Sequence, residues 1–223
     1  MRLVPTLASR GVVHLASAAL AATMLASSYS SASARTVVDF SAPSTAAAFA
    51  AVDDRVMGGA STSRVVHEDG AALFEGNLIV EGGGFASVRY LGEISLSPEA
   101  EALSLEARSD GRKGYKLTLN SAAAPQGVSY QLVLPQLDEG APFERLRLPL
   151  ADFKPSLRGR PATDAPPLRA ADVRGLGLML SRYESGGGIK EPIAPGSFQL
   201  RLRRLAEAES ELAINGRRWV NPQ

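Results

Sequence analysis

The chain has 223 residues with 24 basic and 23 acidic side chains, and its formal net charge of +1 gives no electrostatic case for binding nucleic acid or an anionic membrane. It contains no cysteine, which excludes thiol nucleophiles, disulfides, iron–sulfur clusters and cysteine zinc sites. His67 is the one histidine outside the first 34 residues, so a site with several histidine ligands is excluded there too.

Residues 1–34 have the composition of a cleavable targeting segment. They contain Arg2 and Arg10 but no acidic residue, and an apolar stretch over residues 11–27 is diluted by serine and histidine. Ala32 and Ala34 fit the small-x-small pattern for cleavage before Arg35, which favours a secretory signal, with an organellar transit peptide as the alternative. Its removal takes away two positive charges, so the net charge falls from +1 to −1.

The remainder of the chain predicts an all-β domain over residues 35–206. Short runs of alternating apolar and polar residues are separated by Gly, Pro, Asn and Ser, and no series of predicted helices lies between them. In the strand at 197–205, Phe198, Leu200 and Leu202 point one way while Gln199, Arg201 and Arg203 point the other, as in an antiparallel strand with one wet face. The predicted strands are 64–68, 71–75, 77–81, 85–91, 102–108, 115–120, 128–134, 143–150, 173–180 and 197–205.

Two short helices complete the expected elements. Residues 44–52 predict two helical turns with Ser44 or Thr45 as the N-cap, and a second, weaker helix is predicted after residue 206. The proline-rich span 154–172 predicts an irregular surface loop, and residues 207–223 a loosely attached tail. One domain with about ten strands and little helix favours a two-sheet antiparallel sandwich of the jelly-roll type.

The stretch "DDRVMGGASTSRV" at 53–65 predicts a tight corner. Its glycines allow positive φ or a close backbone approach, its aspartates can accept hydrogen bonds from the following turn, and its methionine is suited to closing the open end of a sandwich. The spacing fits neither a nucleotide P-loop nor a dinucleotide-binding fingerprint; a calcium site on the two aspartates is the remaining alternative. The residues concerned are Asp53, Asp54, Arg55, Met57, Gly58, Gly59 and Ser61.

A second glycine-rich stretch, "EGGGFASVRY" at 81–90, predicts a turn followed by a strand that begins with Phe85 pointing inward. Gly83 and Gly84 belong to the turn, and Arg89 is placed to pair with Asp53 or Asp54. The alternative is a glycine lip around a ligand groove. Farther along, Arg158, Gly159 and Arg160 indicate either ordinary surface arginines or a site for an anion or acidic partner.

Seven motifs in the same order resemble the complex I intermediate-associated protein 30 family, over about residues 37–206. They are "DRVMGGAS" at 54–61, "GGFASVR" at 83–89, "YKLTL" at 115–119, "SYQL" at 129–132, "LPLADFKPSLRGR" at 148–160, "GLGLML" at 175–180 and "GSFQLRLRRL" at 196–205. The resemblance implies a galactose-binding-domain-like β-sandwich. It also implies a chaperone-like role in the assembly of mitochondrial respiratory complex I.

The same resemblance sets the functional expectations. The family has no established catalytic residues, so we expect no enzyme activity, no cofactor and no metal, and a protein partner that is an assembly intermediate of a membrane complex. Mitochondrial targeting is the family expectation, with a secretory, periplasmic or plastid route as the alternative. A carbohydrate- or small-ligand-binding module outside the cytosol is the alternative function.

Overall fold

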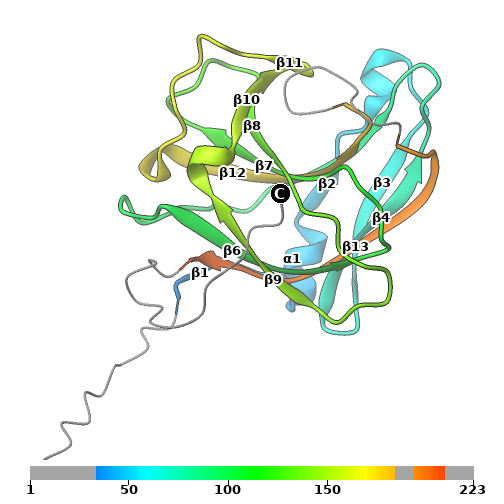
Figure 1. Ribbon diagram of the computed structural model, residues 1–223, viewed down its shortest axis with the longest axis horizontal. Helices are drawn as coiled ribbons and strands as arrows, with labels where there is room; N and C mark the ends of the chain where they lie inside the picture. Colours follow the sequence, from blue (N-terminus) through cyan, green and yellow to red (C-terminus); the bar gives the residue numbers. More distant parts are fainter. Residues whose placement is uncertain (1–33, 184–192, 209–223) are drawn as a thin grey trace, which may run out of the picture. The chain divides into compact units, whose positions relative to one another are not determined.

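We analysed a computed structural model that describes residues 34–183 and 193–208 of the chain. The described residues form a sandwich of two antiparallel sheets (Figure 1). The first sheet has the order β3-β4-β13-β6-β9, with β1 paired to β13. Its strands are β1 Thr36–Asp39, β3 Thr62–Glu68, β4 Ala71–Leu78, β6 Ala102–Ser109, β9 Glu144–Pro149 and β13 Gly196–Glu207.

The second sheet has the order β11-β10-β8-β7-β12-β5-β2. The remaining elements are α1 Pro43–Ala47 and three short 3-10 turns, η1 Asp54–Met57, η2 Leu150–Asp152 and η3 Ala170–Asp172. The strands of this sheet are β2 Phe49–Ala51, β5 Phe85–Tyr90, β7 Tyr115–Ser121, β8 Val128–Val133, β10 Lys154–Leu157, β11 Arg160–Pro161 and β12 Val173–Ser181. The predicted all-β fold class, an antiparallel β-sandwich of two sheets, is confirmed.

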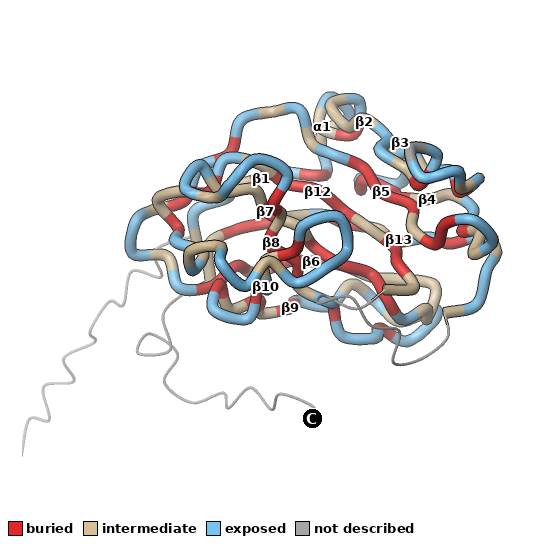
Figure 2. The backbone as a smooth tube through the Cα atoms, turned by 90° about the horizontal axis from the view of Figure 1, so that it is seen from above, coloured by how far each residue is buried: buried red, intermediate tan, exposed pale blue. Residues whose placement is uncertain are grey.

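Alternating side chains of both sheets fill the space between them, and Figure 2 shows buried residues following the strands through the interior. The Phe198 ring on β13 lies 5.0 Å from that of Phe74 and 6.3 Å from that of Tyr115, which comes from the opposite sheet. Leu200 and Leu202 are buried beside Phe198, as their alternation predicts. Aromatic pairs of this kind stabilise a core beyond the area they bury.

The edges of the two sheets define two sides of the sandwich. On one side, β3 lies at the edge of its sheet and contacts β2 and β5 at the edge of the other. The turn η1 crosses between the sheets here. On the other side, β9 and the β10–β11 pair form the edges, and η2 is the crossing. The sequence motifs at 53–61 and 83–85 therefore lie on the first side.

Several predicted elements differ from the observed ones. The strand expected at 71–75 and the first part of the one expected at 77–81 form the single strand β4, which ends at Leu78. Gly76 continues this strand, and a Cβ atom there would lie 1.9 Å from the carbonyl oxygen of Thr62. The loop expected at 154–172 contains β10 and β11. Strand β13 continues through Glu207, so the predicted start of the tail at residue 207 is one residue too early.

The helix predicted at 44–52 is wrong in its second half and in its cap. It ends at Ala47, and its N-cap is Ala42, with Pro43 in the first turn in place of a serine or threonine cap. Phe49 instead begins β2, and its ring lies 5.1 Å from that of Tyr90 on β5. Packing against a neighbouring ring outweighs the weak helical preference of an alanine-rich stretch.

Three further predictions concern residues outside those described: the targeting segment, most of the helix expected after residue 206, and the tail. The start of that helix is wrong, because Ala206 and Glu207 belong to β13. No helix of the described ranges combines the length and hydropathy needed to cross a bilayer.

Candidate functional site

The Asp54 carboxylate is the centre of the corner formed by residues 53–61 and 82–85. It is fully buried and accepts hydrogen bonds from the Ser61 hydroxyl at 2.8 Å and the Ser61 N–H at 3.0 Å. It also accepts the Gly84 N–H at 2.7 Å and the Phe85 N–H at 3.3 Å. One side chain thus joins η1 to the start of β3 and to the start of β5.

Asp53 forms a second, parallel set of bonds. Its carboxylate accepts the Ser63 hydroxyl at 2.6 Å, the Ser63 N–H at 3.0 Å and the Ser87 N–H at 3.0 Å. The Ser87 hydroxyl donates in turn to the carbonyl of Val52. The two adjacent aspartates therefore connect β3 and β5 at successive positions, as the corner hypothesis requires.

The glycines of the corner serve two different needs. Gly58 ends η1 in the left-handed region with φ 86°, a conformation that other residues reach at a cost. Gly59 and Gly83 instead make room: a Cβ atom would lie 2.3 Å from the Asp54 carboxyl carbon at Gly59, and 2.2 Å from its Oδ2 at Gly83. The carboxylate occupies the space in which these side chains would stand.

Burial and hydrogen bonding act on Asp54 in opposite directions. Burial raises its pKa, but the donors from Gly84, Ser61 and Phe85 together outweigh burial and hold the pKa below its ordinary value. The carboxylate is therefore ionised at neutral pH and held by donors of its own chain. A general acid or base needs a pKa near the working pH, and Asp54 lacks this property.

Residues that follow β12 also contact the corner. The Tyr183 hydroxyl donates to the Gly83 carbonyl at 3.0 Å, and the Tyr183 carbonyl accepts from the ammonium of Lys116. Lys116 lies on the outer face of the second sheet, yet it is buried and also contacts the Gln131 side-chain oxygen at 3.3 Å. A polar residue on the outer face of a strand is thus not exposed to solvent at this position.

The surface of the corner presents Arg55 and Met57, both exposed. Met57 is 60% exposed, so the prediction that it closes the open end of the sandwich is wrong. The Asp54 carboxylate and its partners fill the interior of the corner, and Met57 stands outside it.

Two predictions for the strand after the glycines are also wrong. Ala86 and Val88 face the core, while Phe85 lies half-buried on the other face of β5. Arg89 is exposed and, within the described residues, pairs with neither Asp53 nor Asp54, whose oxygens are taken by serine and backbone donors. The predicted ion pair is replaced by hydrogen bonds from neutral groups.

The arginines at 158 and 160 lie on the opposite side of the sandwich from the corner. Arg158 and Gly159 have φ values of 52° and 78° and form the two-residue turn between β10 and β11, the geometry of a type I′ hairpin. All three residues of the "RGR" stretch are exposed. The structure does not bring them together with the other motif residues.

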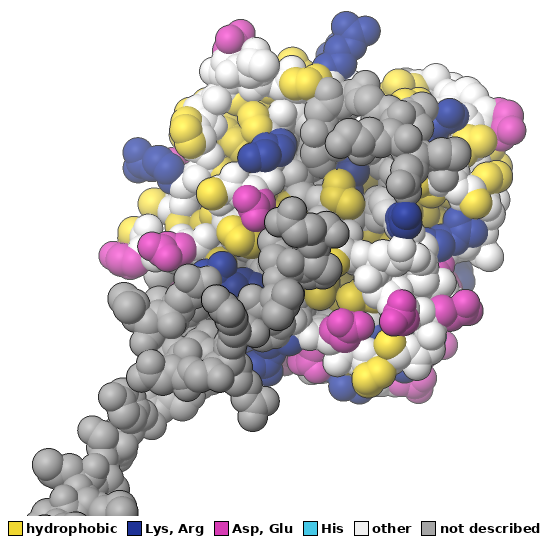
Figure 3. All heavy atoms as spheres, in the orientation of Figure 1, with side chains coloured by type: hydrophobic (Ala, Val, Ile, Leu, Met, Phe, Trp, Pro, Cys, Tyr) yellow, Lys and Arg dark blue, Asp and Glu magenta, His cyan; other side chains and the backbone are white. Residues whose placement is uncertain are grey.

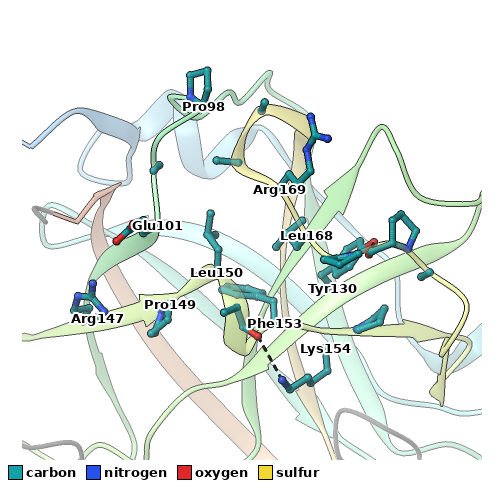
Figure 4. Close-up of a pocket in the computed structure, with 18 residues that line it drawn as sticks. Pro98, Glu101, Tyr130, Arg147, Pro149, Leu150, Phe153, Lys154, Leu168 and Arg169 are labelled. Atoms are coloured by element: carbon teal, nitrogen blue, oxygen red, sulfur yellow. Dashed lines mark hydrogen bonds between the residues drawn. The ribbon is translucent and has the colours of Figure 1, made fainter.

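A groove of about 960 Å³, which the sequence did not predict, lies on this opposite side (Figure 4). Leu150, Phe153, Leu168 and Tyr130 gather at its centre, and the Tyr130 hydroxyl donates to the Pro166 carbonyl. Arg147, Lys154 and Arg169 lie at its margin, with Glu101 as the single acid. The lining is apolar and proline-rich with a basic rim, which suits an apolar segment that carries negative charge.

Other contributors were missed because they are distant in sequence. Ser87 lies 34 residues from Asp53 and Tyr183 lies 100 residues from Gly83, so no local pattern predicts either contact. The described ranges hold no group of three or more His, Asp or Glu side chains placed to bind a metal ion. The calcium alternative on Asp53 and Asp54 has no further carboxylate to support it.

One family model and several solved structures are similar to the chain. The model of the family "Complex I intermediate-associated protein 30" matches residues 38–202. Among curated proteins, no sequence matches the chain. A solved family 11 carbohydrate-binding module from Clostridium thermocellum, in complex with a mixed-linked tetrasaccharide, is 12% identical with a TM-score of 0.48, and the alignment covers 78% of this chain and 95% of the module.

An agarase structure is similar at 13% identity and a TM-score of 0.46, covering 79% of this chain and 26% of the agarase. These structures resemble the chain in backbone architecture, and the likeness says nothing about what it binds. The family match covers almost the whole described domain, including the corner and the groove. The chain belongs to the complex I intermediate-associated protein 30 family.

Proposed function

We propose that the protein is a non-enzymatic, chaperone-like assembly factor that binds an intermediate of respiratory complex I (NADH:ubiquinone oxidoreductase). The observation that carries this proposal is the family match over residues 38–202. The geometry of the corner agrees with it, because the carboxylates of the most characteristic motif are used to hold the backbone of the domain itself.

Binding would use side chains that the core leaves at the surface. Three of the five large hydrophobic side chains exposed in the described part of the chain, Val52, Met57 and Leu91, lie in or directly next to β2, η1 and β5. On the face seen in Figure 3, hydrophobic side chains are interspersed with basic and acidic ones. Such a mixed surface suits reversible shielding of apolar segments, since permanent interfaces are more continuously apolar.

The location of the protein is part of the proposal. A targeting segment over residues 1–34 would export the chain from the cytosol, to mitochondria by the family expectation or by a secretory, periplasmic or plastid route. The compartment that contains complex I or a related membrane complex is the one that the proposed function requires.

Deletion of the gene in its own organism tests the function. We expect the amount of assembled complex I on native gels to fall and subcomplexes to accumulate, and wild-type protein to restore assembly. Met57→Asp should restore it poorly, because it places a charge on the corner surface, whereas Leu157→Asp, the same change in charge at an exposed residue of β10, serves as the control. Normal complex I in the deletion strain would remove the proposal.

A further inference from the structure

Three arginines converge on the outer face of the first sheet, away from the corner and the groove. Arg201 and Arg203 come from β13 and Arg108 from β6, and they line a pocket of about 370 Å³ together with Phe143. Glu68 and Asp69, at the end of β3, complete one wall. We call this the arginine pocket.

The arginines are held close together in spite of their like charge. Arg201 and Arg108 are directly opposite each other in the β13–β6 pair, an arrangement that destabilises a sheet when both side chains are charged. The Phe143 ring offsets part of this cost, since the guanidinium of Arg203 lies 3.9 Å and that of Arg108 5.2 Å from its centroid.

The carboxylates nearby leave one guanidinium unmatched. Arg201 pairs with Glu68, and Arg203 lies 3.7 Å from Glu106. Arg108 forms no ion pair with any carboxylate of the described residues. In addition, the Nε atom of Arg201 is buried without a hydrogen-bond acceptor, although a buried donor of this kind is normally satisfied.

An ion pair on the same sheet that serves only to stabilise the fold has a different arrangement of charges. Arg64 on β3 lies opposite Glu75 on β4, and their side chains pair at 2.7 Å. That pair places opposite charges across the two strands, so each charge is balanced by the other. The arginine pocket places like charges opposite each other, and the described residues supply no carboxylate for Arg108 and no acceptor for the Arg201 Nε atom, which is the pattern of a site that receives an anion from outside.

We propose that the arginine pocket binds a carboxylate side chain from an acidic segment of a protein partner. One unmatched guanidinium calls for one negative charge, and the acids in the wall, Glu68 and Asp69, would repel a dianion such as a phosphate monoester. Arg145 is exposed on the neighbouring strand β9, opposite Glu106, and is available to a second acidic residue of the same segment. That the partner is a protein rests on the proposed function.

Binding of labelled octaglutamate to the full chain, followed by fluorescence anisotropy at low salt, tests this proposal. We expect octaglutamate to bind and octaglutamine not to. Arg108→Gln should weaken binding about tenfold, the effect of removing one hydrogen-bonded charge pair. Phe143→Leu, which removes the ring that positions two of the arginines, should weaken it several-fold without loss of folded structure.

Arg64→Gln is the matched control, because it removes one charge from the same face of the same sheet and should change the affinity less than twofold. Equal weakening by Arg64→Gln and Arg108→Gln would overturn the proposal in favour of general charge attraction. Displacement of the peptide by stoichiometric inorganic phosphate would overturn it in favour of an oxyanion site. Dimerisation of the full chain that Arg108→Gln abolishes would overturn it in favour of self-association. These outcomes leave the gene-deletion test of complex I assembly unaffected, so the two proposals fail separately.

Discussion

The Asp54 carboxylate is a single group on which three segments of the domain depend. Replacing it by alanine leaves the N–H groups of Ser61 and Gly84 buried without an acceptor. We therefore expect Asp54→Ala to lower the free energy of unfolding by ~1–3 kcal/mol, measured by chemical denaturation. Asp164→Ala, in an exposed loop, is the control and should change it by less than about 0.5 kcal/mol.

The lowered pKa of Asp54 gives this effect a pH dependence with a defined sign. An aspartate of the unfolded chain titrates near pH 3.9, and the folded-state pKa of Asp54 is lower. Its stabilising contribution is therefore complete above about pH 3.9 and is lost as the pH falls through the folded-state value. The difference in stability between wild type and Asp54→Ala should shrink in acid; a constant difference would contradict the ionised-carboxylate account.

Gly58 and Gly59 allow backbone strain and steric displacement to be separated. Gly58→Ala meets no atom within 4 Å and should cost about 1–2 kcal/mol through its positive φ. Gly59→Ala collides with the Asp54 carboxylate, so its cost should be largely absent in the Asp54→Ala background. A double-mutant cycle measures this coupling, and strict additivity would show that the carboxylate does not occupy the space beside Gly59.

At the scale of elements, β13 holds the sandwich together through both its core face and its end. The Glu207 carboxylate accepts the Ser97 N–H at 2.6 Å and pairs with Arg35 at 2.7 Å, which fastens β1 beside the last residues of β13. We expect Glu207→Ala to raise amide hydrogen exchange in β1 about tenfold, because Ser97 loses its acceptor and Arg35 its partner. Glu75→Ala, which removes the Arg64 pair, should leave exchange in β1 unchanged.

Strands were predictable to the extent that their pattern is local. The alternation in residues 197–205 survives in β13 as far as Leu202, where a bulge shifts the register and brings Leu205 into the core. No residue of that stretch signals the bulge. The helix at 44–52 failed for a similar reason, since the aromatic neighbours that turn Phe49 into a strand residue come from other parts of the chain.

At the scale of the whole molecule, the corner could be predicted because its aspartates and glycines are adjacent in sequence and have strong local geometric preferences. The groove and the arginine pocket could not, since each gathers residues from at least three segments. Arg108, Phe143 and Arg203 show no distinctive pattern in their own segments of the sequence. Only the register of β6 with β13 and the path of the chain into β9 bring them together.

Strand β1 runs antiparallel to β13 with Thr36 opposite Ala206, so the chain enters and leaves the domain side by side (Figure 1). A pulling force applied between these two points would break the β1–β13 hydrogen bonds one after another, because the force acts mainly on the bond nearest the points of attachment. The Arg35–Glu207 ion pair lies at this first point of separation. A backbone hydrogen bond from the Glu207 N–H to the Arg35 carbonyl accompanies it, so salt would weaken the ionic part of this first contact, and with it the force that separates β1 from β13, while the rest of the sandwich stayed folded.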